Sequence, residues 1–272
     1  LGLRGGGEYG TTDPVTQFGK GGHIDQIEYA LRAVKKGLTV IALKGEHSIC
    51  ILVERRGLPK LQEASSARKI HQIDAHIIGT MAGLSADARV LVDRAQVECL
   101  NHRLEYEDCP SVSYVARFLG DVALSYTMRE DARPFGVSMI LSGFDLLTKA
   151  EDPSRPPPKK HPVPRIFLVE PSGMYQEWKA IAIGRNSPTL MQYLEKNYHS
   201  NIKNAEGLSV VDEQRFIGEL CLAALMEVSK VTHTTVEMAM QTADGGCRVL
   251  QEEEVKVFLD NLERQAEADR DA

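Results

Sequence analysis

The spacing of apolar residues changes several times along this 272-residue chain. From position 24 to position 36 they recur three or four residues apart, which predicts an amphipathic helix with one apolar face: Ile24, Ile27, Leu31 and Val34. Asp25 lies in the first turn of this helix and two lysines lie in the last, as the helix dipole favours. Gly37 follows at the position where a left-handed cap commonly ends a helix.

Short apolar runs bounded by polar or turn-forming residues predict strands. These strands are expected over residues 38–43, 48–53, 70–81, 137–144, 165–170, 178–183, 234–240 and 248–250. The polar turn Lys44–His47 joins the first two strands into a hairpin. Helical spacing returns in five segments, after Ser85, after Ser111, and over 187–198, 212–228 and 252–266, and Ser85 is expected to cap the first of them.

Strands and helices therefore come in groups, which indicates an α+β fold and not alternating βαβ units. Two sheets packed face to face with helices outside each would fit this order, although the pattern alone does not select that arrangement. We expect a flexible tail over 1–22, one domain over 23–266 and a charged tail over 267–272. Residues 149–164 hold six prolines and predict an exposed loop inserted between two strands.

Composition narrows the class of protein. The net charge of -6 argues against nucleic acid as a partner. The five cysteines are scattered, with no pair or Cys/His cluster at metal-ligand spacing, so we expect reduced thiols, no metal and no cofactor. No apolar run is long enough to span a membrane, and residues 1–22 lack the apolar segment of a signal peptide. We expect a soluble intracellular protein without membrane contacts.

Several blocks, in order, resemble the α-type subunits of the 20S proteasome core. They are the helix-to-strand stretch 26–44, Gly83–Arg89, Arg133–Ser138 and Glu170–Gly173. The resemblance implies a four-layer αββα sandwich of the N-terminal-nucleophile hydrolase type, preceded by an N-terminal helix. Three finer stretches, residues 95–104, 182–187 and 193–198, are similar to the eukaryotic α4 type.

The same resemblance locates the remnants of a threonine-protease site. In catalytic relatives the first strand opens with a threonine, whereas here 37 residues precede that position and Leu38 occupies it. Glu54 matches the acidic position, Lys69 the lysine and Arg185 a helping serine. A threonine protease needs a hydroxyl nucleophile and a free terminal amine as its base. The resemblance therefore implies a subunit without catalytic residues.

Lys69 also matches a lysine that α-type subunits place at the pocket between ring neighbours, where the C-terminal carboxylate of an activator or ATPase tail docks. Gly37 and Leu84 match other positions of this pocket, and Glu28 matches one that neighbouring subunits use. A compact ammonium suits a single terminal carboxylate. The alternative is an ordinary surface ion pair of Lys69, for example with Glu63.

The resemblance implies a structural and gating subunit of the outer heptameric α-ring, in the cytoplasm and nucleus. Its partners would be other α and β subunits and regulatory particles. The front of the chain departs from the family, because Thr11–Asp13 and Phe18–His23 replace the usual gate-ordering motifs. One alternative is a hydrolase of the same fold with a processed threonine terminus, although Asp13-Pro14 after Thr11-Thr12 disfavours a strand there. Another is a binding module that uses the proline-rich loop.

Overall fold

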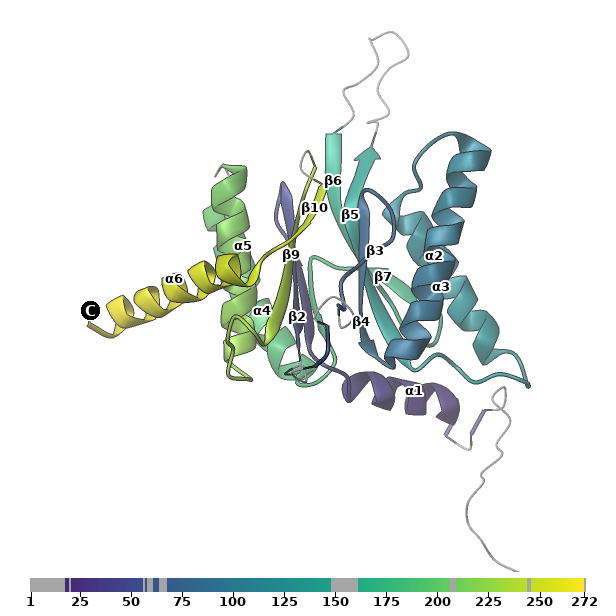
Figure 1. The fold of residues 1–272 in the computed structure, drawn as a ribbon. Coiled ribbons are helices and arrows are strands. Elements are labelled where there is room, and N and C mark those ends of the chain that lie inside the picture. The colour runs from purple at the N-terminus through teal and green to yellow at the C-terminus, as the bar shows by residue number, and fades with distance from the viewer. Residues whose placement is uncertain are drawn as a thin grey trace, which may run out of the picture.

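The chain folds into two antiparallel sheets that pack against each other, with helices on both outer faces (Figure 1). The computed structural model describes residues 18–19, 21–55, 57, 61–63, 68–147, 161–205, 209–243 and 246–271. Most of the expected tail at 1–22, and residues 149–160 of the proline-rich segment, lie outside these ranges. The layers in order are helices, sheet, sheet, helices, which confirms the αββα sandwich.

The first sheet has the strand order β10-β9-β2-β1-β8. Its strands are β1 (Val40–Lys44), β2 (Ser48–Glu54), β8 (Ala180–Ile183), β9 (Val236–Thr242) and β10 (Gly246–Val249). The predicted hairpin is present, with Val40 opposite Val53 and Lys44 opposite Ile49. Both faces of β1 and β2 are buried, which explains why these strands appear in the sequence as continuous apolar runs.

The second sheet has the order β3-β4-β5-β6-β7. Its strands are β3 (His71–Gln72), β4 (Ile77–Gly83), β5 (Val137–Leu147), β6 (His161–Val169) and β7 (Tyr175–Glu177). The single strand predicted over 70–81 is two strands, because a turn brings Ile73 N to within 3.0 Å of Ile77 O. The short strand β7 was not predicted, and its three side chains are all exposed.

The helices α2 (Ser85–Tyr106) and α3 (Val112–Thr127) cover the second sheet, while α4 (Ser187–Ala205) and α5 (Val210–Met226) cover the first (Figure 1). The helix α6 (Glu252–Asp271) packs on α5, and α1 (Asp25–Lys35) lies across the ends of β4 and β5. No helix in the described part of the chain is both long and apolar enough for a bilayer.

Three clusters of buried side chains form the core. One lies between the sheets, and the other two lie between each sheet and its helices. Alternate residues of one strand enter different clusters: Val40 and Ala42 face the other sheet, whereas Ile41 and Leu43 face the helices. The predicted apolar face of α2 is confirmed, since its inward residues are all buried: Ala88, Leu91, Val92, Ala95 and Cys99.

Two helix-end predictions are wrong. Gly37 does not have a positive φ, and the C-cap residue Lys36 before it is in the right-handed region. A glycine is needed there because a Cβ would lie 2.5 Å from the backbone nitrogen of Gly83. Ser85 does not cap α2, because Leu84 occupies the N-cap position without a side-chain hydrogen bond. Ser111 does cap α3, with its Oγ accepting a hydrogen bond from Tyr114 N at 3.2 Å.

Two predicted segment limits also need correction. The proline-rich loop was expected to reach 164, but β6 already begins at His161 and includes Pro162 and Pro164. The strand tolerates these prolines because β7 pairs only with 167–169, so no described strand pairs with the outer edge of the first half of β6. The charged tail expected at 267–272 is helical to Asp271 as part of α6.

Candidate functional site

The positions that match a degenerate catalytic site lie together where β1 begins. Leu38 is buried at 8% exposure, and its neighbour Thr39 at 2%. The Thr39 backbone N–H donates to Glu54 Oε2 at 3.2 Å, and Glu54 N donates back to Thr39 O at 2.8 Å. The Thr39 hydroxyl donates to Arg185 O at 3.0 Å. The structure thus brings Leu38, Glu54 and Arg185 around Thr39, a residue that the sequence analysis did not single out.

In this geometry the polar groups of Thr39 and Glu54 hold the start of β1 against the end of β2 and the segment after β8. A nucleophile of this class needs a hydroxyl or thiol next to a base, but Leu38 supplies neither, and its nitrogen is part of a peptide bond. One oxygen of the Glu54 carboxylate already accepts the Thr39 amide. The Thr39 hydroxyl, which is the nearest one along the chain, is buried and donates to a carbonyl.

The backbone of Lys69 is held by a buried carboxylate. The backbone nitrogen of Lys69, two residues before β3, donates to Oε2 of Glu237, the second residue of β9, at 3.1 Å. Glu237 is only 6% exposed. Burial raises the pKa of the Glu237 carboxyl, and the hydrogen bond from Lys69 N and the nearby arginines Arg55 and Arg68 oppose that shift.

Gly37 and Leu84 meet at the junction of α1 with β4. Gly83 lies between them with φ +125°, and a Cβ on it would lie 2.2 Å from Gly136 O. The Leu84 N–H donates to the same carbonyl at 3.0 Å, while the Leu84 side chain remains 46% exposed. Close backbone packing therefore presents an apolar side chain at the surface beside the end of α1.

Glu28 lies elsewhere on α1. It is seven residues before Lys35, which is about 10 Å along a helix axis. Its carboxylate faces Arg32 Nη2 at 3.9 Å and His23 Nδ1 at 3.5 Å. The structure therefore brings Gly37 and Leu84 together and leaves Glu28 in a separate, partly exposed position.

Two of the sequence blocks meet in one ion pair. Asp87 at the start of α2 accepts hydrogen bonds from Arg133 Nη1 at 2.6 Å and Nη2 at 2.8 Å, and from Gly136 N at 2.9 Å. The hydrogen bonds from Arg133 lower the pKa of the Asp87 carboxyl despite its burial. This cluster fixes the loop before β5 against α2, directly beside Leu84.

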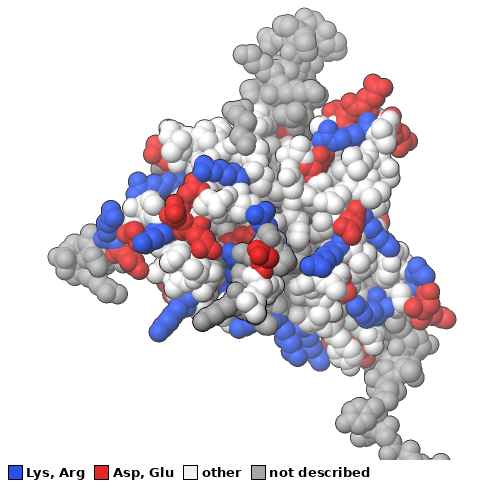
Figure 2. Space-filling model, in the orientation of Figure 1, with Lys and Arg blue, Asp and Glu red and all other residues white. Residues whose placement is uncertain are grey.

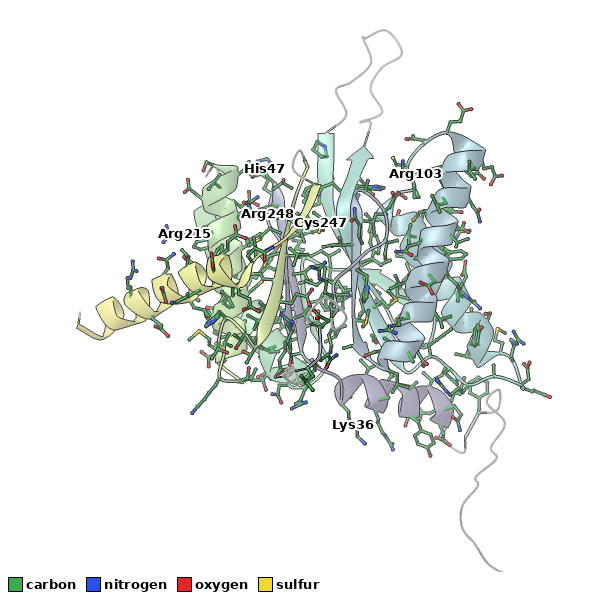
Figure 3. The ribbon with its side chains drawn as sticks, in the orientation of Figure 1. Lys36, His47, Arg103, Arg215, Cys247 and Arg248 are labelled. Carbon is green, nitrogen blue, oxygen red and sulfur yellow. The ribbon has the colours of Figure 1, made fainter. Side chains whose placement is uncertain are left out.

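Lysine and arginine side chains gather on the surface over the C-terminal end of α1 (Figure 2). Figure 3 shows Lys36 there, pointing away from the sheets. Within the described residues, no group of three or more histidine, cysteine, aspartate or glutamate side chains could hold a metal ion. The basic side chains make the solvent-facing surface at the C-terminal end of α1 suited to contacts with an anionic group.

The comparison with known families decides the class. The family model described as "Proteasome subunit" matches residues 34–151 and 159–240. The chain belongs to the proteasome subunit family. A relative named proteasome subunit alpha type-7-B, from Oryza sativa subsp. indica, is 37% identical over 254 residues, which cover 93% of this chain and 92% of the relative.

Two further relatives agree on the α type. Proteasome subunit alpha type-7-A of Arabidopsis thaliana is 37% identical over 255 residues, covering 93% of this chain and 92% of the relative. Proteasome subunit alpha type-8 of Mus musculus is 35% identical over 251 residues, covering 92% of each. The chain is thus an α-type proteasome subunit. These names do not confirm the finer assignment to the eukaryotic α4 type, which stays a prediction.

Proposed function

We propose that this chain is a non-catalytic structural and gating subunit of the outer heptameric α-ring of the 20S proteasome. One observation carries the non-catalytic part: Leu38 occupies the nucleophile position, and the neighbouring Thr39 amide is bound to Glu54. The α-type relatives, similar along nearly their whole length, support the ring position.

The proposal extends to partners. Other α-type subunits, β-type subunits and regulatory particles would contact this chain in the cytoplasm and nucleus, in support of ubiquitin-dependent protein degradation. The exposed Leu84 beside Gly37 and the cationic end of α1 support docking of an anionic activator tail near Lys69. The finer α4 assignment predicts which neighbours flank it in the ring.

Affinity purification of the tagged chain from its own cells tests the proposal. We expect co-purification with other α-type and β-type subunits at equal stoichiometry. The chain released from this complex should cleave no fluorogenic peptide, and Leu38→Thr should restore nothing because its nitrogen stays in a peptide bond. A monomeric native mass would refute the ring role.

The alternative is a hydrolase of the same fold with a processed terminus. N-terminal sequencing of the native chain separates the two. A mature terminus at a threonine, together with peptide cleavage blocked by a threonine-directed inhibitor, would establish the alternative.

A further inference from the structure

An apolar pocket opens between α1, the end of β6 and the start of α4. Its volume is about 210 Å³. Pockets for drug-sized ligands have about 300–1,000 Å³, so this one is suited to a single side chain. Aliphatic and aromatic side chains form most of its wall, among them Leu31, Leu168, Trp178, Ile181 and Met191.

One carboxylate in this apolar wall has no partner. Glu170 lines the pocket at the end of β6 and is half-buried. No hydrogen bond or ion pair to its carboxylate comes from any residue that the structure describes. Burial is accordingly the one cause that raises the pKa of this carboxyl. A half-buried carboxylate without a partner is costly, and a cation supplied from outside the chain would relieve that cost.

The chemistry of the pocket selects the occupant. An apolar channel that ends at one carboxylate matches a side chain with an apolar stem and a cationic head. Both cations can pair with a carboxylate, and arginine can do so through two parallel hydrogen bonds. Lysine, however, carries its charge as a compact head on a four-carbon apolar stem, which suits an apolar wall that ends at one carboxylate better than the planar fork of arginine. Lys35 lies at the same pocket and is exposed, so its charge opposes the incoming cation without pairing with Glu170.

We propose that this pocket receives a lysine side chain of a neighbouring proteasome subunit, with its ammonium on Glu170 and its methylenes against Trp178 and Leu31. The proposal rests on the proposed function, because a neighbour is required. It assigns Glu170 a role in contact between subunits, which differs from the docking of activator carboxylates near Lys69.

Zero-length carbodiimide cross-linking of the purified complex tests the contact directly. This reagent joins a carboxylate to an amine only when the two touch. The complex should carry Lys35→Arg, which keeps the charge of that residue and removes its competing amine. We expect an isopeptide between Glu170 and a lysine of another chain, absent in Glu170→Gln. A product with Lys20 of the same chain, or no Glu170 product while other carboxylates react, would overturn the proposal.

The isolated full chain gives a second test that needs no complex. Trp178 is the only tryptophan of the protein, so its fluorescence reports occupancy of the pocket. Nα-acetyl-lysine methylamide should bind at about millimolar affinity and roughly tenfold more weakly to Glu170→Gln. The norleucine analogue should bind both proteins equally.

The two tests separate the possible failures. If no complex contains this chain, the proposed function fails and the contact with a neighbouring subunit fails with it, while the fluorescence titration still decides whether the pocket prefers a lysine side chain. If the complex forms but lysine and norleucine compounds bind equally, the pocket proposal fails by itself. Tighter binding of an arginine compound would overturn the assignment to lysine.

Discussion

Removing the partner of Asp87 should destabilise the junction between α2 and β5 by an amount that the geometry bounds. The side chain of Asp87 is 10% exposed, whereas that of Arg133 is 61% exposed. Hydrogen bonds to a charged group contribute about 1.5–3 kcal/mol each to stability. Because water reaches the guanidinium, the pair is worth less than a fully buried one, and we expect Arg133→Met to cost about 1.5–3 kcal/mol.

Asp87→Ala should cost more than Arg133→Met. It removes the same ion pair and also leaves Gly136 N–H, which donates to Asp87 Oδ2 at 2.9 Å, without an acceptor. An unpaired buried donor adds about 1–3 kcal/mol. The two substitutions share one interaction, so the double variant should cost less than the sum of the single ones, with a coupling energy of about 1–2 kcal/mol.

Urea denaturation of the three variants and the parent chain measures these free energies, at neutral and at acid pH. Arg133 holds the folded pKa of Asp87 below its unfolded value of about 3.9. A depressed carboxyl pKa stabilises the fold above the unfolded value, and this stability is lost as the pH falls through the folded pKa. Arg133→Met should therefore make stability depend less on pH below about 4. Equal costs for both single variants, or additive costs in the double variant, would refute this reasoning.

Three further changes test other parts of the molecule by denaturation or binding. Glu213→Ala leaves three donors of the β1–β2 turn without their acceptor, namely the backbone N–H groups of His47 and Ser48 and the Ser48 hydroxyl. It should lower the free energy of unfolding by about 3–5 kcal/mol, whereas Glu213→Gln, which keeps one oxygen, should lower it by less. Equal losses for the two variants would contradict this. Gly37→Ala, whose Cβ would lie 2.5 Å from a backbone nitrogen of β4, should cost about 1–3 kcal/mol, while Gly57→Ala, which meets no described atom within 4 Å, is the matched control. Lys69→Ala should weaken binding of a single activator-tail peptide to the assembled core about tenfold. Lys69→Arg should recover part of this affinity. Equal peptide binding by the parent and Lys69→Ala would leave Lys69 as a surface ion-pair residue.

The sequence predicted strongly periodic and continuously apolar segments well. α3 begins where Ser111 was expected to start it, and the hairpin of β1 and β2 has the predicted turn. The sandwich itself came from the family resemblance, since the order of elements fits several layered folds. The short strand β7 carries no apolar residue run, because its side chains are exposed and it is held by pairing with β6.

The sequence did not predict the contacts of residues whose partners lie far away along the chain. Gly37 follows a helix and matches a common C-terminal cap, yet its actual constraint is Gly83, a residue of another element. Glu237 lies within an apolar strand, and nothing local indicates that it binds the backbone of Lys69. The same limit applies to Thr39, whose hydrogen bonds reach residues 15 and 146 positions away. Local patterns predict elements, whereas these contacts depend on how elements pack.

The hydrogen bonds of Thr39 bear on the proposal that this chain is non-catalytic. If only the nucleophile were missing, the Glu54 carboxylate would have no hydrogen-bond partner, and a single substitution at Leu38 could then restore a catalytic site. Here Glu54 makes two hydrogen bonds with Thr39. Its carboxylate accepts from the Thr39 backbone N–H, and its own backbone N–H donates to the Thr39 carbonyl. The preceding helix α1 also packs on the sheet end through Gly37, which keeps the strand continuous with the chain before it. If the proposed function is right, catalysis at this position would require three changes together: a new terminus at position 38, a hydroxyl there and release of Glu54. Each of these changes would break contacts that hold β1 in the fold.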